Sequence, residues 1–116
     1  MKVVYVSNDV KQMDIADELE VYYDMIDCRC IDIVTRKIGK EWYYIICDDE
    51  GLLAGKNPTA FDATGTPMLV GNLIICRHDG EDLAGLTAED VDNIAKHIGY
   101  YRKDGKEQWC IVSMSF

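Results

Sequence analysis

The sequence has no apolar run long enough to cross a membrane, and it has few positive charges. Its 116 residues carry 12 Lys and Arg against 21 Asp and Glu, a net charge of -9. A membrane-spanning helix needs about 20 consecutive apolar residues. A surface that binds nucleic acid is normally basic, because it must neutralise phosphates. We therefore expect neither a membrane protein nor direct binding of nucleic acid.

Motifs for common cofactor chemistry are missing as well. The glycines form neither a G-x-G-x-x-G fingerprint nor a phosphate loop with a G-K-[ST] ending. The apolar stretch at the start of the chain is too short for a secretory signal peptide. The cysteines number five and mostly lie within or beside apolar runs, as reduced thiols do. These absences predict a cytoplasmic protein without a cofactor, and they favour a non-catalytic protein over an enzyme.

The apolar periodicity predicts an α+β fold. We expect strands at residues 3–7, 13–15, 28–38, 41–47 and 68–76, and a hairpin whose turn is Asp104-Gly105. Tight turns join most of these strands, which predicts a mostly antiparallel sheet of about five to seven strands with two helices packed on one face. Residues 1–116 are expected to form a single domain, with 99–116 as a C-terminal hairpin extension.

Capping patterns place the two helices. Asp17 followed by Glu20 resembles a capping box and predicts a first helix of about three turns. Thr87 with Asp90 predicts the start of the second helix, and Gly99 is a suitable residue to end it.

Three consecutive carboxylates, Asp48-Asp49-Glu50, precede Gly51. Their spacing does not match a calcium-binding EF-hand loop, and Asp and Gly are ordinary turn residues, so we expect a turn. Residues 56–67 contain both prolines and are expected to form a loop, which is long for a chain of this size. The segment 48–62 is therefore our candidate binding site, with Asn57, Pro58 and Asp49 as its residues.

Cys28-x-Cys30 and Cys76-x-His78 each place two soft metal ligands on one face of an expected strand. If the strands were neighbours, a zinc site or a cysteine–histidine hydrolase would be conceivable. Structural zinc sites normally use longer Cys spacings in turns, and none of the cysteines begins an expected helix. We expect no metal, and we retain a Cys/His metal-binding or hydrolytic protein only as an alternative.

Aromatic residues are adjacent at several places, and adjacent side chains cannot all face one core. The set is Tyr22, Tyr23, Trp42, Tyr43, Tyr44, Tyr100, Tyr101 and Trp109. Partly exposed Tyr and Trp are enriched at interfaces. We therefore expect a protein that binds another protein or a second copy of itself. The eight acidic residues between 9 and 32 leave an acidic DNA mimic as an alternative, provided that they share a surface with the acids of the second helix.

The middle of the chain resembles a known family. Residues 48–53 are similar to an N-E-E-G-K-L turn, residues 57–60 to an L-P-x-N-R-A loop and residues 68–75 to an I-I-x-G-x-x-x-I strand. Together, over roughly residues 1–98, they resemble the family known as domain of unknown function 3846, although the arginine of the family's loop is absent here. The resemblance implies a small accessory protein of bacteria, phages or other mobile elements, where a counter-defence role is conceivable. It implies no particular chemistry.

Overall fold

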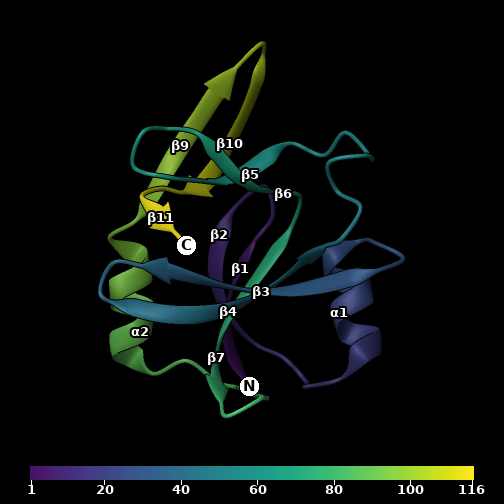
Figure 1. Ribbon diagram of the computed structural model, residues 1–116, viewed down its shortest axis with the longest axis vertical. Coiled ribbons are helices and arrows are strands. Elements are labelled where there is room, and N and C mark those ends of the chain that lie inside the picture. The colour runs from purple at the N-terminus through teal and green to yellow at the C-terminus, as the bar shows by residue number, and fades with distance from the viewer.

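The computed structural model describes all 116 residues apart from the side chain of Lys106, and it contains two helices and eleven strands (Figure 1). The helices are α1 (Leu19–Ile26) and α2 (Ala88–Ala95). The strands are β1 (Lys2–Val6), β2 (Val10–Asp14), β3 (Ile31–Ile38), β4 (Glu41–Asp48), β5 (Pro58–Phe61), β6 (Pro67–Val70), β7 (Leu73–Asp79), β8 (Asp82–Ala84), β9 (Ile98–Lys103), β10 (Lys106–Ile111) and β11 (Met114–Ser115).

The strands form two sheets. The larger has the order β11-β3-β4-β7-β1-β2, with β8 paired to β7, and every pairing in it is antiparallel. The smaller has the order β6-β5-β10-β9, in which β10 pairs with β5 in parallel. The expected α+β fold with a mostly antiparallel sheet is confirmed, although strands outnumber the prediction.

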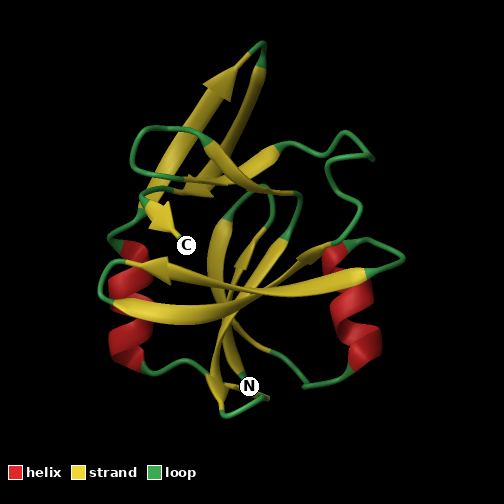
Figure 2. Cartoon of the chain, in the orientation of Figure 1, coloured by secondary structure: helices red, strands yellow, loops and turns green.

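The two helices lie on opposite faces of the larger sheet, so the expectation that both pack on one face is wrong (Figure 2). Tyr22 and Ile26 of α1 pack with Ile46 on one face. Ile94 of α2 packs with Ile45 on the other face, where the smaller sheet adds its own apolar side chains. The central strands carry consecutive apolar residues because both of their faces are covered, and this pattern signals a sheet buried on both sides.

One of the two predicted helix caps is present. Thr87 and Asp90 form the expected capping box, in which each side chain accepts a hydrogen bond from the other residue's backbone N–H. The cap predicted at Asp17 is wrong, because α1 begins after Glu18 without a side-chain cap, and Asp17 accepts a hydrogen bond from the Tyr22 hydroxyl instead. Gly99 does not end α2. It lies in β9, where pairing with β10 determines its conformation.

The stretch from 56 to 76 differs most from the prediction. Residues 58–61 of the expected loop form β5, and the expected strand 68–76 is divided into β6 and β7, which belong to different sheets. The chain crosses between the sheets at Gly71, whose φ of +74° lies in the left-handed region that favours glycine. Gly71 therefore marks the point at which the chain crosses from the smaller sheet to the larger one.

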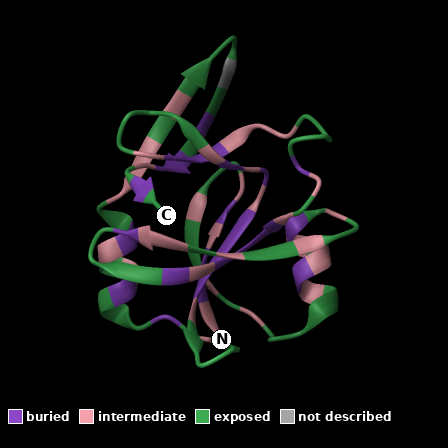
Figure 3. Ribbon diagram, in the orientation of Figure 1, coloured by how far each residue is buried: buried purple, intermediate pink, exposed green. Residues whose placement is uncertain are grey.

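The hairpin of β9 and β10 turns at Asp104-Gly105 as predicted. Both turn residues have positive φ, 53° and 77°, which is typical of a type I′ turn. The base of the hairpin contributes Ile111 to the core, whereas its outer part extends beyond the rest of the molecule and is largely exposed (Figures 1 and 3). Neither helix in the described structure is long and apolar enough to span a membrane.

Candidate functional site

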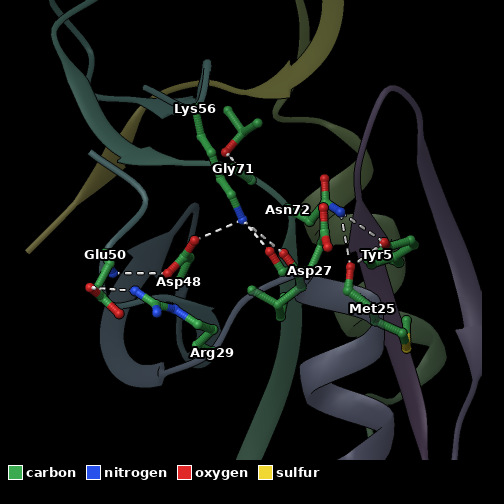
Figure 4. A network of polar contacts seen from close by, with 11 residues as sticks. Tyr5, Met25, Asp27, Arg29, Asp48, Glu50, Lys56, Gly71 and Asn72 are labelled. Atoms are coloured by element: carbon green, nitrogen blue, oxygen red, sulfur yellow. Dashed lines mark hydrogen bonds and ion pairs between the residues drawn. The ribbon is translucent and has the colours of Figure 1, made fainter. Parts of the chain in front are cut away.

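Lys56 is the centre of a polar cluster that joins three distant segments (Figure 4). Its Nζ lies 2.7 Å from Asp48 Oδ2 and donates to the backbone oxygens of Ile26, at 3.2 Å, and Asp27, at 2.6 Å. An ammonium group has three donors, and all three have partners here. The carbonyls at the C-terminal end of a helix attract a cation. Lys56 therefore ties the end of α1 to the end of β4.

Asp48 is the charged partner of Lys56 in this cluster. Its side chain is only 5% exposed, and it also accepts a hydrogen bond from the Glu50 backbone N–H at 2.8 Å. Burial acts to raise the pKa of Asp48, but the hydrogen bonds from Lys56 and Glu50 outweigh it and hold that pKa below its usual value. A carboxylate that stays ionised and paired is a poor general base. Of the three consecutive acids at 48–50, Asp48 thus forms a buried structural ion pair with Lys56.

Gly71 and Asn72 complete the cluster. A Cβ atom at Gly71 would lie 2.8 Å from Lys56 Cδ, so a larger residue would displace the lysine. Asn72 Nδ2 donates to the Tyr5 hydroxyl at 3.1 Å and to the Met25 backbone oxygen at 2.9 Å. Burial is the main cause of a raised pKa for Tyr5. The polar Asn72 inside an apolar run was the one signal in the sequence that could have indicated this contact.

A small polar cavity of about 220 Å³ lies beside Lys56, and Asn57 lines it. Pro58 begins β5, and its carbonyl accepts a hydrogen bond from Gln108 at 2.6 Å. Asp49 lies apart from this cavity, at an exposed position near the thiol of Cys30. The structure therefore brings together Asn57 and Pro58 but not Asp49. No described residue that lines the cavity is a cysteine or histidine, and Lys56 has no donor left for a ligand.

The cysteines and His78 occupy separate environments. Cys76 is buried and its thiol donates to the Tyr44 carbonyl, while His78 stacks on the Tyr44 ring at 4.4 Å. Burial raises the pKa of Cys76 to about 12, and desolvation together with nearby acids raises the pKa of Cys30. Among the described residues, no group of three Cys, His, Asp or Glu could hold a metal ion. A reactive thiol needs a lowered pKa, so the hydrolytic and zinc alternatives gain no support.

Asp90 holds α2 against the larger sheet. It is 2% exposed, and its oxygens lie 2.6 Å from both Nε and Nη2 of Arg77. Burial acts to raise the pKa of Asp90, but hydrogen bonds from Arg77 and Thr87 lower it to about 2. This residue is thus not part of an acidic surface. The helices α1 and α2 also cover opposite faces of the larger sheet.

The aromatic residues divide into buried and exposed groups. Tyr22 and Tyr43 are in the core, whereas Trp42, Tyr100 and Trp109 are 44%, 48% and 45% exposed. Tyr100 and Trp109 face each other across β9 and β10, with their rings edge to face at 4.9 Å. They form one exposed aromatic pair on the hairpin, and this pair is the second candidate site.

Two sheets, helices on opposite faces and a structural ion-pair cluster define a small α+β protein. The family described as Domain of unknown function (DUF3846) matches residues 1–99, so the chain belongs to that family. No curated protein and no solved structure matches the chain. The match ends just after β9 begins, and the aromatic pair therefore lies outside it.

Proposed function

We propose that this protein is a non-catalytic accessory protein that binds other protein chains through the aromatic pair Tyr100 and Trp109. The observation that carries the proposal is that two adjacent aromatic side chains, each nearly half exposed, lie on a hairpin that extends away from the core. Aromatic residues with few rotatable bonds are frequent hot spots of protein interfaces. Side chains of this kind gain most from being covered by a partner.

Two further features support the hairpin as the binding element. Apart from the first two residues of β9, it lies outside the part of the chain that matches the family model. Its charge also differs from that of the rest of the chain. Arg102, Lys103 and Lys106 against Asp104 and Glu107 give the hairpin a net charge of +1, within a chain of -9.

The cellular setting is part of the proposal. All five cysteines are free in the structure, as they are in the reducing cytoplasm. We propose a cytoplasmic protein of a bacterium or of a mobile element within it, in line with the family resemblance. A role in countering host defence would be one form of such protein binding.

The experiment is capture of proteins from a bacterial lysate, followed by calorimetric titration of each captured protein in purified form. We expect Trp109→Ser to weaken binding about 30-fold or more, since loss of an interface hot spot costs about 2 kcal/mol. Trp42→Ser is the matched control, because Trp42 is equally exposed but lies on β4 in the larger sheet. Equal binding by the wild type and Trp109→Ser would contradict the proposal, and so would an equal loss in both variants.

A further inference from the structure

Strand β9 is an edge strand of the smaller sheet, and some of its backbone groups face outward. Its pairing with β10 closes at Lys103 and Lys106 around a two-residue turn, so these two residues form a hydrogen-bonded pair and every second pair after them does the same. The hydrogen bond from the Val112 N–H to the His97 carbonyl, at 2.8 Å, continues this alternation. The backbone groups of the intervening residues must therefore point outward. These residues are Ile98, Tyr100 and Arg102.

Each of three other sheet edges, on β3, β6 and β2, has at least one feature that hinders strand addition. On the outer edge of β3, the Ile33 N–H is bound by the Asp32 carboxylate at 2.9 Å, and the Thr35 carbonyl by the Arg36 guanidinium at 2.9 Å, while β11 covers the end of the strand. The edge strand β6 is four residues long and begins with Pro67. On β2, the Val10 N–H is bound by the Asp9 carboxylate. Short strands, proline and charged side chains are common ways to prevent strand addition.

In the described part of the chain, no hydrogen bond to the outward backbone groups of β9 is present. The strand is six residues long and contains neither proline nor a bulge. An edge of this kind can accept another strand.

The sequence of β9 complements itself in an antiparallel pairing with a second copy. If Tyr100 lies opposite Tyr100 of the other copy, the three outward residues form three hydrogen-bonded pairs, about six hydrogen bonds. In this register Arg102 lies opposite Ile98, and Tyr101, whose ring stacks on Phe61 of its own chain, lies opposite Gly99. No two like charges lie directly opposite.

The aromatic pair joins the two copies in the same register. Each Tyr100 already contacts its own Trp109, and cross-strand neighbours in a hydrogen-bonded pair are about 5.5 Å apart. The exposed rings of both copies would therefore form one continuous row across the interface, as aromatic cross-strand pairs do in sheets.

Charge favours the same surface. The chain has a net charge of -9 and the hairpin one of +1, so the rest of the chain has a net charge of -10. Most other contacts between two copies would bring acidic surfaces together. Electrostatic repulsion between two copies is therefore smallest when they meet through their hairpins.

From these observations we infer that the protein forms a symmetric dimer by antiparallel pairing of β9 with β9 of a second copy, centred on Tyr100. This inference rests on the proposed binding role of the hairpin and names its partner. The interface is small, so the dimer is reversible and depends on concentration. Added salt strengthens it by screening the repulsion between the acidic bodies.

Sedimentation velocity over the micromolar to millimolar range tests the inference. We expect a monomer–dimer equilibrium. Arg102→Pro, which removes an outward N–H, should weaken the dimer about tenfold or more. Arg102→Ala is the matched control: it loses the same side chain and its ion pair with Glu107 but keeps the N–H, and it should dimerise like the wild type. A wild-type chain that remains monomeric throughout overturns the inference, as does equal weakening by both variants.

Disulfide trapping tests the register. In a background with Cys30→Ser, which removes the exposed native thiol, Tyr100→Cys should form a covalent dimer on oxidation, because its two sulfurs meet on the symmetry axis. Arg102→Cys should not, because its two copies lie about 13 Å apart along the strand. Equal trapping at both positions, or trapping only at 102, overturns this register. A monomer that still captures another protein through Trp109 overturns the dimer and leaves the proposed function standing.

Discussion

Strands β3 and β9 both lie near the outside of a sheet, but their outward backbone groups differ in whether side chains bind them. On β3, the Asp32 carboxylate accepts a hydrogen bond from the Ile33 N–H, and the Arg36 guanidinium donates one to the Thr35 carbonyl. On β9, the charged side chain of Arg102 instead pairs with Glu107 of the neighbouring strand, and the outward groups have no partner among the described residues. The same residue types can thus close an edge or leave it open, depending on which backbone they reach. In the proposed dimer, the β3 side of the molecule is structural and the hairpin is the side that binds another chain.

The largest expected change in stability comes from the buried ion pair between Asp90 and Arg77. Asp90→Ala removes the buried partner of Arg77 and should lower the free energy of unfolding by about 3 kcal/mol, as measured by urea denaturation. Glu107→Ala breaks an exposed ion pair of the hairpin and should cost less than about 0.5 kcal/mol. A similar loss from both substitutions would remove the distinction between the two regions.

Low pH should also lower the free energy of unfolding, because it protonates Asp90 and breaks its ion pair with Arg77. The lowered pKa of Asp90 means that its stabilisation is fully present above its unfolded pKa near 3.8 and is lost as the pH falls toward about 2. We expect a decrease of about 2 kcal/mol in the free energy of unfolding across this window from Asp90 alone. Asp90→Asn should flatten the decrease, which denaturation at a series of pH values will show. An unchanged slope in the variant would assign the acid sensitivity to other groups.

The crossing between the sheets offers a smaller and more local test. Gly71→Ala places a Cβ against Lys56 at a positive φ, whereas Gly65→Ala has a φ of +84° but open space around it. Both variants should lose about 1 kcal/mol from backbone strain, and Gly71→Ala should lose roughly a further 1 kcal/mol from the displaced lysine. Thermal unfolding of the pair measures the difference. If the two variants are equally stable, the Lys56 cluster contributes little.

The smallest expected change in stability tests the protection of β3 directly. Asp32→Ala frees the Ile33 N–H and should change the free energy of unfolding by less than about 0.5 kcal/mol, but it should promote association through the β3 edge. Asp32→Asn keeps an acceptor oxygen and is the matched control. Sedimentation in the Arg102→Pro background isolates this edge, and a monomer in both variants would show that the carboxylate does not protect it.

Local signals in the sequence predicted much of the fold. The capping box at Thr87 and the Asp104-Gly105 turn depend only on residues close in the chain, and both are present. The placement of the helices and the division of residues 68–76 depend on which surface lies above each face of the sheet, and neighbouring residues do not reveal this. The candidate residues Asn57, Pro58 and Asp49 remain a prediction. Lys56 could not be identified, because its partners lie about 30 residues earlier in the chain and in a turn that looked ordinary.

The C-terminal strands also have a consequence for folding. β11 pairs with β3, and β10 joins β5, so the last residues complete both sheets. Met114 is buried in the same core as Ile38, its pairing partner on β3, which lies 76 positions earlier in the chain. Contacts over such long stretches of chain are slow to form, because the loop entropy is lost before the contact stabilises the fold. During synthesis on the ribosome, the N-terminal strands should therefore remain incompletely folded until β10 and β11 have emerged.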